Sequence, residues 1–124
     1  MISIAKSDGV VPVLIIFPSP VYENAPPEAK IYAATDISLK GTWEAFVIAL
    51  GHIRRNLREL AEENNIPIID VNSSFEKLND NYKGKFELFI DSMHLTPKGN
   101  KLIAETMLKP IKIIAKQSTI AVSN

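Results

Sequence analysis

Two residues near the end of the chain carry the chemistry that the sequence indicates most clearly. Asp91 and His94 stand three positions apart in Asp-Ser-Met-His-Leu-Thr-Pro-Lys-Gly-Asn, directly before a predicted helix. At this spacing a carboxylate can accept the Nδ1–H of the imidazole and fix its tautomer, which leaves the other ring nitrogen free to take a proton from a nucleophile. The pair by itself also fits a loop histidine that hydrogen-bonds a nearby helix cap.

Other candidate residues each have an ordinary structural interpretation as well. Ser19 lies at the carboxyl end of a predicted strand, where open α/β sheets place their sites, but a serine between two prolines is typical of a turn. Asp70 ends a second strand and either joins Asp91 and His94 around a metal or caps the next turn. The turn interpretation is favoured for both, and the sequence predicts no metal and no cofactor.

Three side chains in the middle of the chain have weaker signals. His52 falls on the polar face of a long predicted helix, beside two arginines, which favours a solvated surface position. Trp43 and Tyr32 flank the long loop after the first strand and either line an acyl or sugar pocket or pack the loop. The sequence does not separate these two roles.

The elements that must position these residues follow from apolar periodicity and turn chemistry. A helix over residues 1–6 stops at Ser7-Asp8-Gly9, and a β-branched run over 10–17 predicts a strand buried on both faces, with Pro12 near its start. A long loop follows over 21–41, with a short helix around 28–34. The longest helix is predicted over 42–64 and is closed by Asn64-Asn65. Its inward stripe consists of Phe46, Leu50, Ile53, Leu57 and Leu60.

The second half of the chain repeats this pattern of strand and helix. A strand over 66–71 precedes a short helix over 75–78, for which Ser73 or Ser74 is the predicted cap, and a polar turn over 79–85. An apolar segment over 86–90 leads into the Asp91 block. A last helix begins at Pro97 with Thr96 as its cap, and is expected to turn Leu102, Ile103, Met107 and Leu108 inward. Strand, long helix and strand form a βαβ unit, which predicts a parallel sheet with a right-handed crossover.

Composition narrows the class of protein. The 124 residues are enough for one domain over 1–124, and 14 basic against 14 acidic residues give a formal net charge of zero. A neutral chain has no general attraction to nucleic acid or to an anionic membrane. The longest apolar run, over 10–17, is too short to span a bilayer. No cysteine and no secretory signal occur, which favours a cytoplasmic protein.

The block from Asp91 to Gly99, with His94-Leu95-Thr96-Pro97 opening a final amphipathic helix, resembles the last conserved block of the SGNH (GDSL-type) esterases and lipases. The strand over 10–17 that ends in Pro-Ser-Pro resembles the fourth strand of that family. Leu-Arg-Glu-Leu-Ala over 57–61, followed by Ile-Pro-Ile-Ile-Asp over 66–70, resembles its next helix and fifth strand. The resemblance covers most of the chain but only the C-terminal part of the family's domain.

This resemblance implies a flavodoxin-like three-layer α/β/α sandwich with a parallel sheet, without the N-terminal strands of the SGNH hydrolase fold. It also implies hydrolysis of carboxylic esters such as acyl esters, acylated sugars or lysolipids, with His94 as general base and Asp91 as its orienting partner. The family's nucleophile lies in Gly-Asp-Ser, and its oxyanion hole uses a glycine and a Gly-x-Asn-Asp motif. None of these blocks occurs here, since Ser7-Asp8-Gly9 has the reversed order and precedes a strand.

Without a nucleophile, the chain is expected to have no triad-based esterase activity by itself. The alternatives are a catalytically inactive α/β interaction module and a small ligand- or metal-binding flavodoxin-like protein. The strand over 10–17 leaves a long apolar edge, which invites pairing with another chain. The sequence therefore predicts a homodimer, or a complex with a complementary N-terminal fragment, through this edge. Gly99 inside the last helix predicts close backbone packing beside the His94 loop, because glycine in a helix costs about 1 kcal/mol relative to alanine.

Overall fold

The computed structural model describes residues 1–27, 30, 43–77 and 87–122, and the statements below concern these residues. The predicted polar turn over 79–85 lies outside them, and of the short helix predicted around 28–34 only Lys30 is described. The elements in chain order are α1 (Ile2–Ser7), β1 (Leu14–Ile16), α3 (Trp43–Glu63), β2 (Ile68–Asp70), α4 (Val71–Lys77) and α5 (Pro97–Val122).

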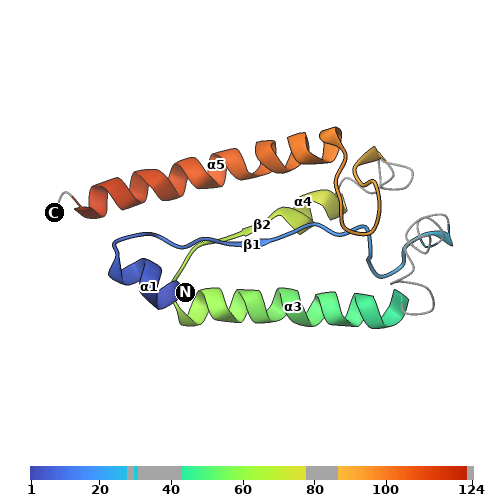
Figure 1. Ribbon diagram of the computed structural model, residues 1–124, viewed down its shortest axis with the longest axis horizontal. Helices are drawn as coiled ribbons and strands as arrows, with labels where there is room; N and C mark the ends of the chain where they lie inside the picture. Colours follow the sequence, from blue (N-terminus) through green and yellow to red (C-terminus); the bar gives the residue numbers. More distant parts are fainter. Residues whose placement is uncertain (28–29, 31–42, 78–86, 123–124) are drawn as a thin grey trace.

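The two strands form a parallel two-stranded sheet in the described part of the chain, so the fold is mixed α/β as predicted. Leu14 pairs with Ile68, Ile15 with Ile69 and Ile16 with Asp70. The parallel direction requires a crossover, and α3 provides it, which confirms the βαβ unit. The two strands lie between α3 on one side and α5 on the other (Figure 1).

The main core lies on the α5 side of the sheet. Phe75 of α4 and Phe89 of the loop before α5 are fully buried, and their rings meet edge to face with centroids 5.8 Å apart. Such an aromatic pair is favourable beyond the area that it buries. The buried members of this core are Ile69, Val71, Phe75, Leu88 and Phe89, and the side chains of α5 that pack against them are Leu102, Ile103, Met107 and Ile114.

Both predicted helix stops before the strands are confirmed. Gly9 has φ +72°, and Val10 N–H donates to Ala5 O at 2.8 Å, which ends α1. Asn65 has φ +47°, and Ile66 N–H donates to Ala61 O at 3.0 Å, which ends α3. Glycine and asparagine tolerate this left-handed conformation, so each can reverse the chain into the following strand.

Two packing predictions for the helices are wrong in detail. In α3, Phe46 and Leu50 of the predicted stripe pack against the buried Trp43, which confirms that part of the stripe. Ile53 and Leu60 are 53% and 38% exposed, and Ala61 is buried instead, so the inner stripe is shifted by one position at these two places. In α5, Leu108 is 55% exposed instead of inward. The apolar stripe of α3 is broad enough to fit either rotation, and the polar partners of Arg54 described below accompany the observed one.

The first strand is also shorter and less buried than predicted. Pairing with β2 covers only Leu14–Ile16 of residues 10–17, and Ile15 and Phe17 are 38% and 53% exposed while Ile16 is buried. The prediction of a strand buried on both faces is therefore wrong for residues 10–17, because the burial of an apolar run depends on which elements cover each face of the strand. The cap of α4 differs as well, since the helix begins at Val71 and Asp70, not Ser73 or Ser74, caps it.

Helix α5 is the longest element and contains Pro110. A proline in a helix has no N–H to donate, so the bond to the carbonyl of Thr106 is missing from the helical ladder. None of the helices in the described ranges has the length and apolarity that a bilayer span requires.

Candidate functional site

The loop that holds Asp91 and His94 is a small closed structure at the start of α5. Phe89 and Leu95 form an antiparallel bridge across it. Ile90 N–H donates to His94 O at 2.7 Å, and Thr96 N–H donates to Leu88 O at 2.9 Å. These backbone bonds fold the segment back on itself, so Asp91 and His94 are presented at its tip.

The carboxylate of Asp91 organises this tip. Its Oδ1 accepts the N–H of Met93 at 2.8 Å and that of His94 at 2.7 Å. Its Oδ2 lies 2.7 Å from Nδ1 of the His94 ring. One side chain therefore fixes both the backbone of the turn and the orientation of the imidazole, and the contact between Asp91 and His94 that the spacing predicts is present.

The same hydrogen bonds set the charge of Asp91. The backbone N–H groups of Met93 and His94, and then the His94 ring, favour the ionised carboxyl and lower its pKa to about 2. The side chain of His94 is 74% exposed and that of Asp91 39% exposed. Among the described residues, Nε2 of His94 has no hydrogen-bond partner.

The base of the loop is joined to α5 as the sequence predicts. Thr96 Oγ1 accepts the N–H of Gly99 at 3.1 Å, which is the hydrogen bond of an N-cap, and it donates to Glu87 O at 2.6 Å. A Cβ on Gly99 would overlap the carbonyl oxygen of Leu88 and come within 2.8 Å of Leu95 Cδ2. Glycine at this position thus lets the helix start approach the strand-like arm of the His94 loop.

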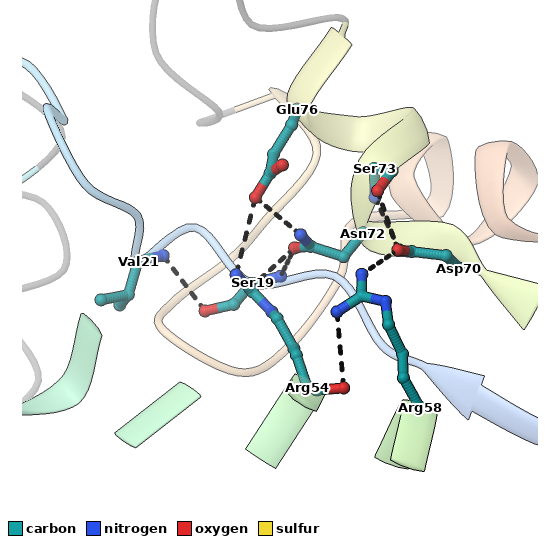
Figure 2. A network of polar contacts seen from close by, with 8 residues as sticks. All are labelled: Ser19, Val21, Arg54, Arg58, Asp70, Asn72, Ser73 and Glu76. Atoms are coloured by element: carbon teal, nitrogen blue, oxygen red, sulfur yellow. Dashed lines mark hydrogen bonds and ion pairs between the residues drawn. The ribbon is translucent and has the colours of Figure 1, made fainter. Parts of the chain in front are cut away.

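A second polar cluster lies at the carboxyl ends of β1 and β2, and the sequence interpretation missed its central member (Figure 2). Arg54 of α3 donates from Nη2 to Asn72 Oδ1 at 2.8 Å and lies 3.5 Å from Glu76 Oε1. Asn72 is buried, its Nδ2 donates to Glu76 Oε1 at 2.6 Å, and its Oδ1 also accepts the N–H of Ser19 at 3.4 Å. The cluster therefore connects α3, α4 and the segment after β1.

Burial and charge act against each other on Arg54. Its side chain is only 17% exposed, and this burial lowers the pKa of the guanidinium, while the charges of Glu76 and Asp70 raise it. Its Nε is buried and has no hydrogen-bond partner among the described residues. The stripe that would have revealed Arg54 runs through positions 43, 47, 50, 54, 57 and 61 at alternating spacings of four and three.

Asp70 belongs to the edge of this second cluster. It accepts the N–H of Ser73 at 2.9 Å and its hydroxyl at 2.8 Å, and it pairs with Arg58 of α3. Burial raises the pKa of Asp70, but the bonds from Ser73 and Arg58 outweigh it, and the pKa lies below its ordinary value. These contacts support the predicted turn-capping role. No group of three or more potential metal ligands occurs among the residues that the structure describes.

The remaining candidates occupy ordinary positions. Ser19 Oγ accepts the N–H of Val21 at 3.1 Å, which is the contact of a turn residue. His52 is exposed on α3, as predicted. Trp43 is buried and lines an open groove of about 300 Å³ together with Lys30 and Val47, whereas Tyr32 lies outside the described residues.

Comparisons with known proteins add no relative. No family model matches the chain, and neither the search of curated proteins nor the search of solved structures finds a match.

Proposed function

We propose that this chain supplies the general-base half of an ester hydrolase of the SGNH type. In this proposal His94 takes the proton of a serine hydroxyl that attacks a carboxylic ester, and Asp91 holds the imidazole in the productive tautomer and stabilises the imidazolium that forms. The three-layer flavodoxin-like sandwich belongs to the same proposal. In this proposal the nucleophile comes from a polypeptide segment other than the described residues, of which none forms a hydrogen bond to Nε2 of His94.

The observation that carries the proposal is the double use of the Asp91 carboxylate. A loop histidine that merely caps a helix would bond to backbone groups, whereas here the ring nitrogen meets a carboxylate oxygen at 2.7 Å. The other oxygen of the same carboxylate is occupied by two backbone amides, so the ring and the turn are locked together. The pKa of the Asp91 carboxyl is lowered to about 2, so the carboxyl is ionised at neutral pH and can orient the histidine there.

The tautomer of His94 provides the first test, and it needs no substrate. With Nδ1–H donated to Asp91, neutral His94 should be the Nδ1–H tautomer, which long-range ¹⁵N–¹H spectra of the ring identify. His52, which is exposed on α3, serves as the internal reference and should show the ordinary mixture dominated by Nε2–H. In Asp91→Asn the preference of His94 should disappear. A wild-type His94 that matches His52 would contradict the proposed role of Asp91.

The second test restores the missing nucleophile. The chain is coexpressed with an N-terminal segment of an SGNH esterase that carries the Gly-Asp-Ser and Gly-x-Asn-Asp blocks, and hydrolysis of p-nitrophenyl acetate is measured. We expect activity at least about 100-fold above that of either partner alone, lost in His94→Ala and retained in His52→Ala, because proton transfer of this kind contributes about 10²–10⁴-fold. Turnover by the 124-residue chain alone that depends on His94 would show that no second half is needed.

The alternative of a catalytically inactive interaction module is supported by a different observation, the exposed apolar residues of β1. Ile15 and Phe17 are 38% and 53% exposed beside a strand that has a single strand neighbour among the described residues. If the complemented protein forms but hydrolyses no ester, this second function is favoured. In either case the partner of this edge is a second copy of the chain or a complementary segment.

A further inference from the structure

The charges of the chain are unevenly distributed, and α5 carries an excess of basic residues. This helix contains five lysines and one glutamate, whereas the rest of the chain contains nine basic and thirteen acidic residues. The formal net charge of zero therefore includes one helix with four excess positive charges. Neutrality of the whole chain does not exclude an attraction between this helix and an anionic surface.

Three of these lysines lie on one side of the helix, because positions 109, 112 and 116 follow one another at spacings of three and four. They are exposed, and two aliphatic side chains between them, Leu108 and Ile113, are 55% and 48% exposed. Five residues that line the same hollow on α5 are called the basic face: Leu108, Lys109, Lys112, Ile113 and Lys116.

The positive charge of the basic face is not neutralised within the described structure. Glu105 lines the same hollow, but its Oε1 lies 3.9 Å from Nζ of Lys101, one turn earlier on the helix. Among the described residues, Lys109, Lys112 and Lys116 form no ion pair. The basic face therefore has the charge that complements an anionic partner.

The position of α5 leaves this side of the helix accessible. Leu102, Ile103 and Met107 pack against the core, so they define the side that faces the sheet. The helical repeat of 3.6 residues places Leu108 and Lys112 on the opposite side. In Figure 1, α5 is the outermost layer, and no described element lies beyond it on that side. A flat surface can therefore approach the helix without meeting another element.

We propose that the basic face of α5 docks on the surface of a lipid bilayer that contains anionic headgroups. In this arrangement α5 lies along the surface. The three lysines contact the anionic groups of the lipids, and Leu108 and Ile113 enter the boundary between the headgroups and the acyl chains. The methylene stems of the lysines cover apolar surface while their ammonium groups stay at the level of the headgroups.

The composition of the basic face favours a bilayer over other anionic partners. A nucleic-acid backbone offers phosphates to the lysines but no apolar region for Leu108 and Ile113, whereas a bilayer offers both. Interfaces between proteins are enriched in arginine and aromatic residues and depleted in lysine. The basic face has three lysines and neither an arginine nor an aromatic residue, so an acidic protein is the less suitable occupant.

Docking is independent of the proposed ester hydrolysis. Lys112 lies fifteen residues after Pro97, which is about 22 Å along the helix from the His94 loop. None of the residues of that loop belongs to the basic face. Failure of vesicle binding therefore leaves the tautomer test of His94 unaffected, and failure of that test leaves vesicle binding unaffected.

Cosedimentation of the full chain with lipid vesicles tests the proposal. We expect binding to phosphatidylcholine vesicles with about 30 mol % phosphatidylserine to be at least about tenfold tighter than binding to pure phosphatidylcholine vesicles. Most of the bound protein should be released when the salt concentration is raised from about 0.1 M to about 1 M, because salt screens surface charges. Equal binding to the two kinds of vesicle, or no binding to either, overturns the proposal.

A pair of double variants separates the basic face from the total charge. Lys112→Gln with Lys116→Gln should weaken binding to the mixed vesicles about 30-fold, since each lysine near an anionic surface contributes about fivefold. Arg55→Gln with Lys77→Gln is the matched control, because it removes the same charge from exposed residues of α3 and α4. This control should bind like the wild type. Equal losses in the two double variants overturn the assignment to α5.

The apolar part of the basic face distinguishes a bilayer from a nucleic acid. Leu108→Ser should weaken vesicle binding about fivefold, because less apolar surface enters the bilayer. Ile53→Ser is the control, since Ile53 is 53% exposed on α3, and it should have no effect. Fluorescence anisotropy with a DNA duplex of about 20 base pairs should detect no binding at the protein concentration that saturates the vesicles. Tight binding to the duplex, or an unchanged vesicle affinity in Leu108→Ser, overturns the proposed docking.

Discussion

The loop with Asp91 and His94 and the cluster around Arg54 are both polar, but they are held together in different ways. In the loop, Asp91 bonds only to residues two and three positions away, and the side chain of His94 is 74% exposed. In the cluster, Asn72 joins residues that are 18 and 53 positions away, and it is buried. The comparison shows that a short motif can build a reactive pair locally, whereas a buried polar cluster depends on the complete packing of α3, α4 and β1.

The largest loss of stability is expected when Arg54, the central residue of the cluster, is replaced. Arg54→Ala leaves the buried Asn72 and the 43% exposed Glu76 without their cation partner, so the free energy of unfolding should fall by about 2–3 kcal/mol, most of it from the lost hydrogen bond to Asn72. Arg55→Ala is the matched control, because Arg55 is exposed on the same helix and its loss should cost less than about 0.5 kcal/mol. Chemical denaturation measures both. Equal effects of the two variants would remove the distinction between the cluster and the surface.

A substitution at Gly99, where the His94 loop packs against the start of α5, should destabilise the fold nearly as strongly. Gly99→Ala forces a Cβ against the Leu88 carbonyl oxygen, and overpacking of this kind costs about 1–3 kcal/mol. Gly51→Ala is the control, because a Cβ there meets no atom within 4 Å and alanine in a helix is favoured by about 0.5–1 kcal/mol. The two variants should therefore shift the midpoint of thermal unfolding in opposite directions. Parallel shifts would show that Gly99 is not a packing requirement.

A smaller effect is expected at the cap of α5. Thr96→Ala removes the oxygen that accepts the N–H of Gly99, and losing such a cap costs about 1 kcal/mol. Thr96→Ser keeps the hydroxyl and should retain most of the stability. Thermal unfolding measured by circular dichroism separates the two variants, and a serine variant as unstable as the alanine variant would assign the loss to the methyl group instead of the cap.

Protonation of Asp91 is expected to have the smallest effect on the stability of the whole molecule. Its effect should be confined to the His94 loop, whereas changes in the cluster around Arg54 should destabilise the whole fold. The pKa of Asp91 is lowered to about 2 in the fold, so its contribution is fully present above about pH 4 and is lost as the pH falls through about 2. NMR titration of the carboxyl and of the Met93 and His94 amides should show one transition near pH 2. A transition near pH 4 would mean that the carboxyl accepts no hydrogen bonds.

The sequence predicted those parts of the fold and site that depend on neighbouring residues. The helix stops at Gly9 and Asn65, the cap at Thr96 and the Asp91–His94 contact all rest on spacings of a few residues. The parallel pairing of the strands followed from their alternation with α3. Arg54 was missed because the rotation of α3 is decided by partners on α4, which lies 18 positions further along the chain. The burial of β1 was overestimated for the same reason, since exposure depends on covering elements and not on the run itself.

Pro110 has a consequence for how α5 opens. Because the ladder lacks the bond from position 110 to the carbonyl of Thr106, the helix can unzip from its C-terminal end to that point without breaking the bonds over 97–109. Amide exchange should therefore divide into two classes, with slower exchange before Pro110, where Leu102, Ile103 and Met107 pack on the core, and faster exchange after it, where Ile114 is the one described α5 side chain that packs on this core. Ile111 is the first residue beyond this break, so exchange should change from the slower to the faster class at this position.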